Sequence, residues 1–156
     1  VHPHTAVENL SLAQARDLFG GYVQDWSELG AGGGRVQLVG REEGSGARSA
    51  FTRVVMRDQP LALTVLLLPG DAEVIDYVAS HPGAAGFASM RLLPSEALSA
   101  DQPVRVASLE DLQPGEDGYP LARAIDFVLP PSPSPVALAL RDFLLSDQGQ
   151  EALRSR

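Results

Sequence analysis

Residues 35–56 have the sequence RVQLVGREEGSGARSAFTRVVM and predict a strand, a turn and a helix in direct succession. The strand is a short alternating apolar run over Val36–Val39 that ends at Gly40. The helix is expected over Ala47–Met56, where apolar residues recur at helical spacing. The turn between them therefore decides what this part of the fold presents to a ligand.

That turn has the features of an oxyanion site. The first turn of a helix has unpaired N–H donors and the positive end of the helix dipole. Gly44 and Gly46 allow the backbone to approach a ligand, and Ser45 can cap the helix or donate its hydroxyl. Arg41 offers a planar fork that suits a tetrahedral oxyanion. The alternative is a capped helix after a tight turn, with Arg41 merely solvated.

Two better-known phosphate motifs do not fit this turn. A P-loop requires a lysine after its second glycine, whereas Ala47 follows Gly46. The spacing also differs from the three-glycine dinucleotide fingerprint. The turn must therefore be judged together with the rest of the chain.

Length and composition narrow the classes of protein to consider. The chain has 156 residues, enough for one ordinary domain, and 44% of them are hydrophobic. The longest apolar run, Leu61–Leu68, is too short to span a membrane, and no signal segment is recognisable. A net charge of −8 argues against a nucleic-acid surface, and the lack of cysteine excludes disulfides and thiol chemistry. Because the negative net charge does not attract anions at long range, an anion must be held by local dipoles and Arg41.

The remaining pattern alternates between helices and strands and favours an α/β fold. Ser11 is a plausible N-cap for a helix that stops at Gly20-Gly21, and Trp26 is expected to anchor a short turn to the core. Further helices are expected over Asp71–Ser80, with Asp71 as the cap, over Leu92–Asp101 as a helical turn, from Pro135 onward, and over Gln148–Leu153. Further strands are expected over Ala84–Ala88, Val104–Val106 and Leu121–Leu129, with 114–119 as loop and 130–135 as a proline-rich connector. The run Leu61–Leu68 could be a buried strand or part of a helix.

In this order the pieces resemble the phosphate-binding proteins of bacterial phosphate ABC transporters, which are periplasmic substrate-binding proteins. The resemblance rests on five stretches: Leu10–Trp26, Arg41–Arg48, His81–Phe87, Tyr119–Arg123 and Gly149-Gln150. Arg41-Glu42-Glu43-Gly44-Ser45-Gly46-Ala47-Arg48 is similar to the family's ligand loop, Arg-x-Asp/Glu-Gly-Ser-Gly-Thr-Arg. His81-Pro82-Gly83-Ala84-Ala85-Gly86-Phe87 is similar to its Asn-Pro-Gly-Ala-Ile-Gly-Tyr. The five occur in the family's order over nearly the whole chain.

The resemblance implies a lobe of a two-lobed clamshell of the type II periplasmic-binding-protein class, with three α/β/α layers and a mixed sheet. It places the second lobe at about residues 5–119, and the return strand and C-terminal helices at 120–156, where they would pack on a first lobe largely missing from this chain. The predicted oxyanion ligands are Arg41, Gly44, Ser45, Gly46, Ala47 and Arg48. Ala47 stands where the family has threonine, so the ligand could be phosphate held less tightly or another oxyanion.

The implied function is binding of phosphate or a similar oxyanion outside the cytoplasm, in the periplasm or as a cell-surface lipoprotein, with an ABC transporter permease as partner. No cofactor, metal ligand, catalytic residue or nucleic-acid partner is expected. One alternative is a sensing or interaction domain that keeps the fold without transport. Another is a hydrolase with Ser45 as nucleophile, for which the base would have to be His2, His4 or His81.

The C-terminal helix carries one further expectation. Its apolar residues are Val136, Leu140, Phe143 and Leu144. Without a first lobe to cover them, they must pack back on this lobe, pair with another copy or stay exposed. We expect a homodimer or a domain swap through this helix.

Overall fold

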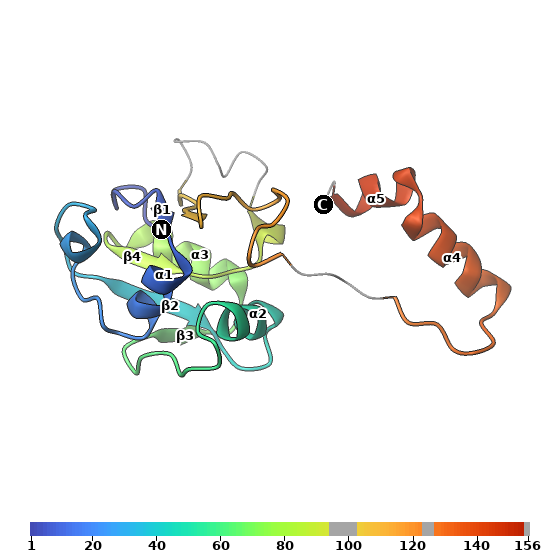
Figure 1. Cartoon of the computed structure of the whole chain (residues 1–156), viewed down its shortest axis with the longest axis horizontal. Coiled ribbons are helices and arrows are strands. Elements are labelled where there is room, and N and C mark those ends of the chain that lie inside the picture. The colour runs from blue at the N-terminus through green and yellow to red at the C-terminus, as the bar shows by residue number, and fades with distance from the viewer. Residues whose placement is uncertain (94–102, 123–126, 155–156) are drawn as a thin grey trace. The chain divides into compact units, whose positions relative to one another are not determined.

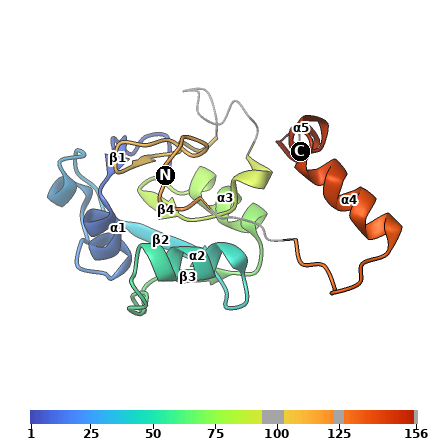
Figure 2. The same ribbon diagram turned by 45° about the vertical axis from the view of Figure 1, so that its right-hand side comes forward.

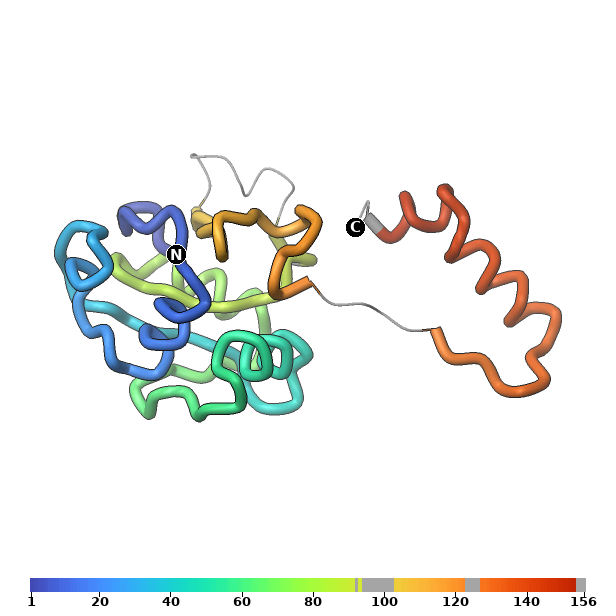
Figure 3. Tube along the Cα trace, in the orientation of Figure 1, coloured from blue at the N-terminus to red at the C-terminus, as the bar shows by residue number. Residues whose placement is uncertain are grey.

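The structure is a computed structural model that describes residues 1–93, 103–122 and 127–154. The chain divides into two units, Val1–Ala122 and Arg123–Arg156 (Figures 1 and 3). The first unit contains β1 (Asn9–Leu10), α1 (Leu12–Phe19), η1 (Trp26–Leu29), β2 (Gln37–Arg41), α2 (Gly46–Val54), β3 (Leu66–Leu68), α3 (Asp71–Ser80), β4 (Ala84–Gly86), η2 (Met90–Leu92) and β5 (Ser108–Leu109). The second contains α4 (Pro135–Leu145) and α5 (Asp147–Arg154).

The main sheet has β2 at its centre. Its strand order is β3-β2-β4 with parallel pairing throughout, and β1 and β5 form a separate parallel pair. Beyond β4, the N–H of His2 donates to the carbonyl oxygen of Ala84 at 3.0 Å. Val1 and Arg105 then exchange both backbone hydrogen bonds, at 2.7 and 2.8 Å, which is the antiparallel pattern. The strand expected over 104–106 is therefore reduced to this single hydrogen-bonded pair, which does not extend into a ladder.

Helices cover both faces of the sheet. Successive strand residues point to opposite faces, and Leu38 and Val39 belong to two different core clusters. Leu38 packs in the cluster that includes Phe51 of α2, and Val39 packs with Val74 of α3. In Figure 2, β2 passes between α2 and α3. The predicted three-layer α/β/α arrangement is confirmed for this unit.

The N-terminal helix and the tryptophan follow the sequence closely. Ser11 caps α1 in a capping box: its Oγ accepts from the N–H of Gln14 at 3.1 Å, and Oε1 of Gln14 accepts from the N–H of Ser11 at 2.9 Å. Trp26 is 2% exposed, and its Nε1 donates to the carbonyl oxygen of Gly83 at 3.0 Å. The prediction that Trp26 anchors its turn to the core is confirmed.

Several expected elements differ in extent. Of Leu61–Leu68 only the last three residues form a strand, because only they pair with β2, and the side chain of Leu63 is fully exposed. No strand forms in the described part of the segment 121–129, and residues 123–126 lie outside the described residues. Most of the helical turn expected over Leu92–Asp101 also lies outside them, and η2 ends at Leu92.

In the second unit, α4 begins at Pro135, and the Oγ of Ser134 accepts from the N–H of Ala137 at 3.2 Å. The two predicted C-terminal helices are therefore present. Val136, Leu140 and Phe143 are exposed in α4. None of the helices in the described ranges is both long and apolar enough to cross a membrane.

Candidate anion-binding site

The predicted loop lies at the carboxyl end of the central strand. β2 ends at Arg41, α2 begins at Gly46, and Ser45 is the N-cap. Gly44 has φ +85°, a left-handed conformation that favours glycine, and nothing lies within 4 Å of where its Cβ would be. Residues 43–47 are exposed or half-buried. The loop is thus open at the sheet edge where ligands bind in open α/β folds.

The first turn of α2 presents free hydrogen-bond donors. Oγ of Ser45 accepts from the N–H of Arg48 at 3.4 Å, which satisfies one of the four orphan donors. Within the described part of the chain, the N–H groups of Gly46 and Ala47 donate to no protein acceptor. This turn contains no acidic residue. Two unpaired amides and the positive end of the dipole together favour an anion at this position.

Arg41 is engaged by the neighbouring strand and helix. Its Nη1 forms an ion pair with the carboxylate of Asp71, and its Nη2 donates to the carbonyl oxygen of Pro69 at 2.7 Å. The two charged side chains are 14% and 17% exposed. The sequence predicted that this fork faces an oxyanion, whereas both terminal nitrogens here contact residues 69–71.

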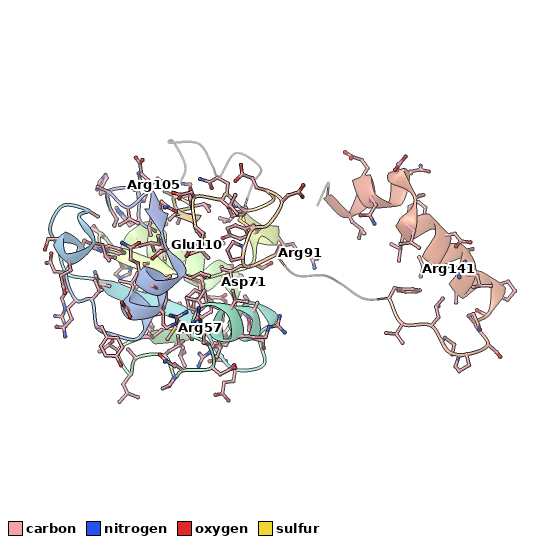
Figure 4. The ribbon with its side chains drawn as sticks, viewed as in Figure 1. Arg57, Asp71, Arg91, Arg105, Glu110 and Arg141 are labelled. Atoms are coloured by element: carbon pink, nitrogen blue, oxygen red, sulfur yellow. The ribbon has the colours of Figure 1, made fainter. Side chains whose placement is uncertain are left out.

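Asp71 has a different role from the one expected. It was predicted to cap α3, but Gly70 is the N-cap and has no side-chain capping bond. Asp71 is the first residue of the helix, and its carboxylate pairs with Arg41 instead; the residue is labelled in Figure 4. The β2–β3 register pairs Arg41 with Leu68, which brings residues 69–71 beside the guanidinium. The contact between Asp71 and Arg41 was not predicted, because local sequence pattern does not indicate which strands lie side by side. A predicted parallel pairing of β2 with β3 would have placed the two residues next to each other.

Arg48 supports the loop from the other side. Its Nη1 donates to the carbonyl oxygen of Arg41 at 2.8 Å, which ties the first turn of α2 to the end of β2. The six predicted residues, Arg41, Gly44, Ser45, Gly46, Ala47 and Arg48, therefore belong to one continuous strand end, turn and helix start. Their role in binding stays a prediction.

The histidines proposed as a base for Ser45 are engaged elsewhere. The ring of His81 stacks on Tyr77 with centroids 3.9 Å apart, and its Nδ1 lies 2.8 Å from the carbonyl oxygen of Tyr77. Nδ1 of His2 accepts from the N–H of His4 at 3.1 Å. A hydrolase mechanism would need one of these rings to leave its partners and reach Ser45.

A cavity of about 550 Å³ lies at the opposite end of the strands. It is lined by Gly21, Val23, Gln24, Arg35, Val36, Gln37, Leu38, Thr64, Leu66 and Tyr77. These residues surround the beginning of β2, whereas the loop follows its end. The cavity is therefore separate from the predicted anion loop. No cluster of metal-binding side chains is present among the residues that the structure describes.

A family model described as a PBP superfamily domain matches residues 1–148. The chain belongs to the PBP superfamily. The curated phosphate-binding protein PstS of Bacillus subtilis (strain 168) is 26% identical over 100 residues, which are 64% of this chain and 33% of that protein.

Two solved structures share this fold of the PBP superfamily. One is a putative phosphate ABC transporter substrate-binding protein with bound phosphate from Clostridium perfringens, with a TM-score of 0.73 and 21% identity over 97% of this chain and 62% of that one. The other is PstS from Borrelia burgdorferi, with a TM-score of 0.75 and 15% identity over 99% of this chain and 64% of that one. The chain thus spans one third of the curated relative and less than two thirds of each solved chain. At these identities the structures show the fold.

Proposed function

We propose that this chain is part of an extracytoplasmic solute-binding protein that binds phosphate or a similar tetrahedral oxyanion. The protein would deliver the anion to an ABC transporter permease and would catalyse no reaction. The observation that carries the proposal is that, in the described part of the chain, the N–H groups of Gly46 and Ala47 at the open N-terminus of α2 have no acceptor. The names of the relatives, a phosphate-binding protein and a phosphate ABC transporter substrate-binding protein, agree with this chemistry.

In this proposal the ligands are Arg41, Gly44, Ser45, Gly46, Ala47 and Arg48, and residues 5–119 form the lobe that carries them. This chain supplies one side of the ligand shell, and water screens the other. We therefore expect a dissociation constant nearer millimolar than micromolar, which corresponds to about −4 rather than −8 kcal/mol.

Calorimetric titration with phosphate, sulfate and molybdate tests the proposal. Arg41→Ala should abolish binding because it removes the guanidinium beside the loop. Ala47→Thr should tighten binding about fivefold, since a restored hydroxyl donor contributes about 1 kcal/mol. Arg53→Ala, which removes an equal charge from the exposed last turn of the same helix, is the matched control and should leave affinity nearly unchanged. Wild-type affinity in both Arg41→Ala and Ala47→Thr would place the anion elsewhere.

We also propose that two copies pair, or exchange segments, through α4. The support is its apolar side chains, of which Val136, Leu140 and Phe143 recur at helical spacing and are exposed. Light scattering should report a dimer at high protein concentration, and Leu140→Asp should shift it toward monomer. A strict monomer in the wild-type chain would contradict this pairing.

A further inference from the structure

The ion pair between Arg41 and Asp71 joins two neighbouring elements at the carboxyl edge of the sheet. Arg41 is the last residue of β2, and Asp71 is the first residue of α3, which follows β3 directly. Both side chains are largely buried, so water screens the pair less than it would a surface pair. The carbonyl oxygen of Pro69 holds the second terminal nitrogen at 2.7 Å.

The guanidinium of Arg41 nevertheless does not use all of its hydrogen-bond donors. Its Nε is buried and has no hydrogen-bond partner among the residues that the structure describes. A buried donor without a partner is unusual in a folded protein and calls for an explanation. Nε of Arg105 and Nη2 of Arg16 are in the same state, so this atom does not by itself identify a ligand. Asp71 and Pro69 occupy the two terminal nitrogens, which are the donors that an oxyanion would need for a two-pronged contact.

A carboxylate and a tetrahedral oxyanion are the same kind of partner for arginine. Each presents two oxygens to the planar fork, and each is negatively charged. An oxyanion bound at Gly46 and Ala47 would lie on the loop that begins at Arg41, and it would meet a guanidinium whose charge Asp71 already balances. The two anions would repel one another as well as compete for the same donors.

We propose that Asp71 occupies Arg41 in the anion-free protein and competes with the oxyanion for it, so that this carboxylate sets an upper limit on affinity. The inference rests on the proposed function of the loop and identifies a residue that regulates it. Asp71 would act as a built-in antagonist, and loss of its charge should strengthen anion binding.

The test compares two carboxylates of the same helix turn. Asp71→Asn keeps the shape and an oxygen that can still accept from Arg41, but it removes the charge. Glu73→Gln removes an equal charge from an exposed side chain that makes no bond to Arg41 within the described residues. Phosphate and sulfate titrations should show at least tenfold tighter binding in Asp71→Asn and a change of less than about twofold in Glu73→Gln. The gain should disappear when Arg41→Ala is added to Asp71→Asn.

The outcomes separate the two proposals. Wild-type binding that depends on Arg41, with equal or weaker binding in Asp71→Asn, would overturn the competition and leave the anion site intact. An equal gain in affinity in Glu73→Gln would also overturn the competition. The gain would then follow from the loss of any nearby negative charge and not from the release of Arg41. Binding in Asp71→Asn but not in the wild-type protein would support the competition. No binding in either of these two proteins would refute both the competition and the anion site. Asp71→Ala gives the same comparison should the asparagine variant fold poorly, with folding checked by Trp26 fluorescence.

Discussion

The substitution Gly83→Ala tests whether the His-Pro-Gly segment requires a glycine where it packs against the backbone of the sheet. The φ of Gly83 is +83°, and a Cβ added there would lie 2.6 Å from the carbonyl oxygen of Arg35. The left-handed backbone costs a residue with a Cβ about 1–2 kcal/mol. To relieve the collision, Gly83 must shift, although its carbonyl oxygen accepts from Nε1 of Trp26 at 3.0 Å and from the N–H of Gln37 at 3.1 Å. Weakening each bond costs about 1 kcal/mol, so Gly83→Ala should lower the free energy of unfolding by about 3–4 kcal/mol.

Gly32 provides the matched control. Its φ is +76°, but nothing lies within 4 Å of where its Cβ would be. Gly32→Ala should therefore lose only the backbone contribution, about 1–2 kcal/mol. Urea unfolding can be followed by the fluorescence of Trp26, because the chain has a single tryptophan and its side chain is buried. Losses that agree within about 0.5 kcal/mol would refute the argument that close approach to Arg35 requires a glycine, since both glycines have a positive φ and of the two only Gly83 has a close neighbour at its Cβ position.

Two further substitutions test the local structure. Ser11→Ala removes the side-chain half of the α1 capping box and should lower the free energy of unfolding by about 1 kcal/mol in urea titration; no measurable loss would mean that the cap is not formed in solution. Phe51 lies with its ring stacked 4.2 Å from Phe87 and edge-on 4.7 Å from Phe19. Phe51→Ala should cost about 3–5 kcal/mol by calorimetric melting, and a loss below about 1 kcal/mol would show that this cluster is not packed as described.

Local pattern was sufficient where local chemistry decides the structure. The cap at Ser11, the strand and helix around 35–56 and the start of α4 at Pro135 depend on residues within a few positions of one another. These elements could therefore be predicted with boundaries within about two residues. The predicted loop also lies open between its strand and its helix, as the sequence indicated.

What local pattern left open or predicted wrongly concerns pairing between distant segments. Leu61–Leu68, which is apolar except for Thr64, was left open as a strand or part of a helix, and its strand is limited to the three residues that have partners in β2. Asp71 is of a residue type that commonly caps helices, but the register of β2 and β3 places it beside Arg41, with which it forms an ion pair. Both outcomes depend on which strand lies beside which, and periodicity in one segment carries no information on its neighbour.

The same neighbour relation determines which helix end can take an anion. α2 and α3 both begin at the carboxyl edge of the sheet, and each has orphan N–H groups and a positive dipole end. The first turn of α3 contains Asp71 and Glu73, so its dipole already has negative charge beside it. The first turn of α2 contains no acidic residue, includes Arg48 and leaves the amides of Gly46 and Ala47 unpaired among the described residues. Among the described residues both termini have free donors, but only the first turn of α2 lacks an acidic side chain. Asp71 links the two termini through its ion pair with Arg41, the last residue of β2.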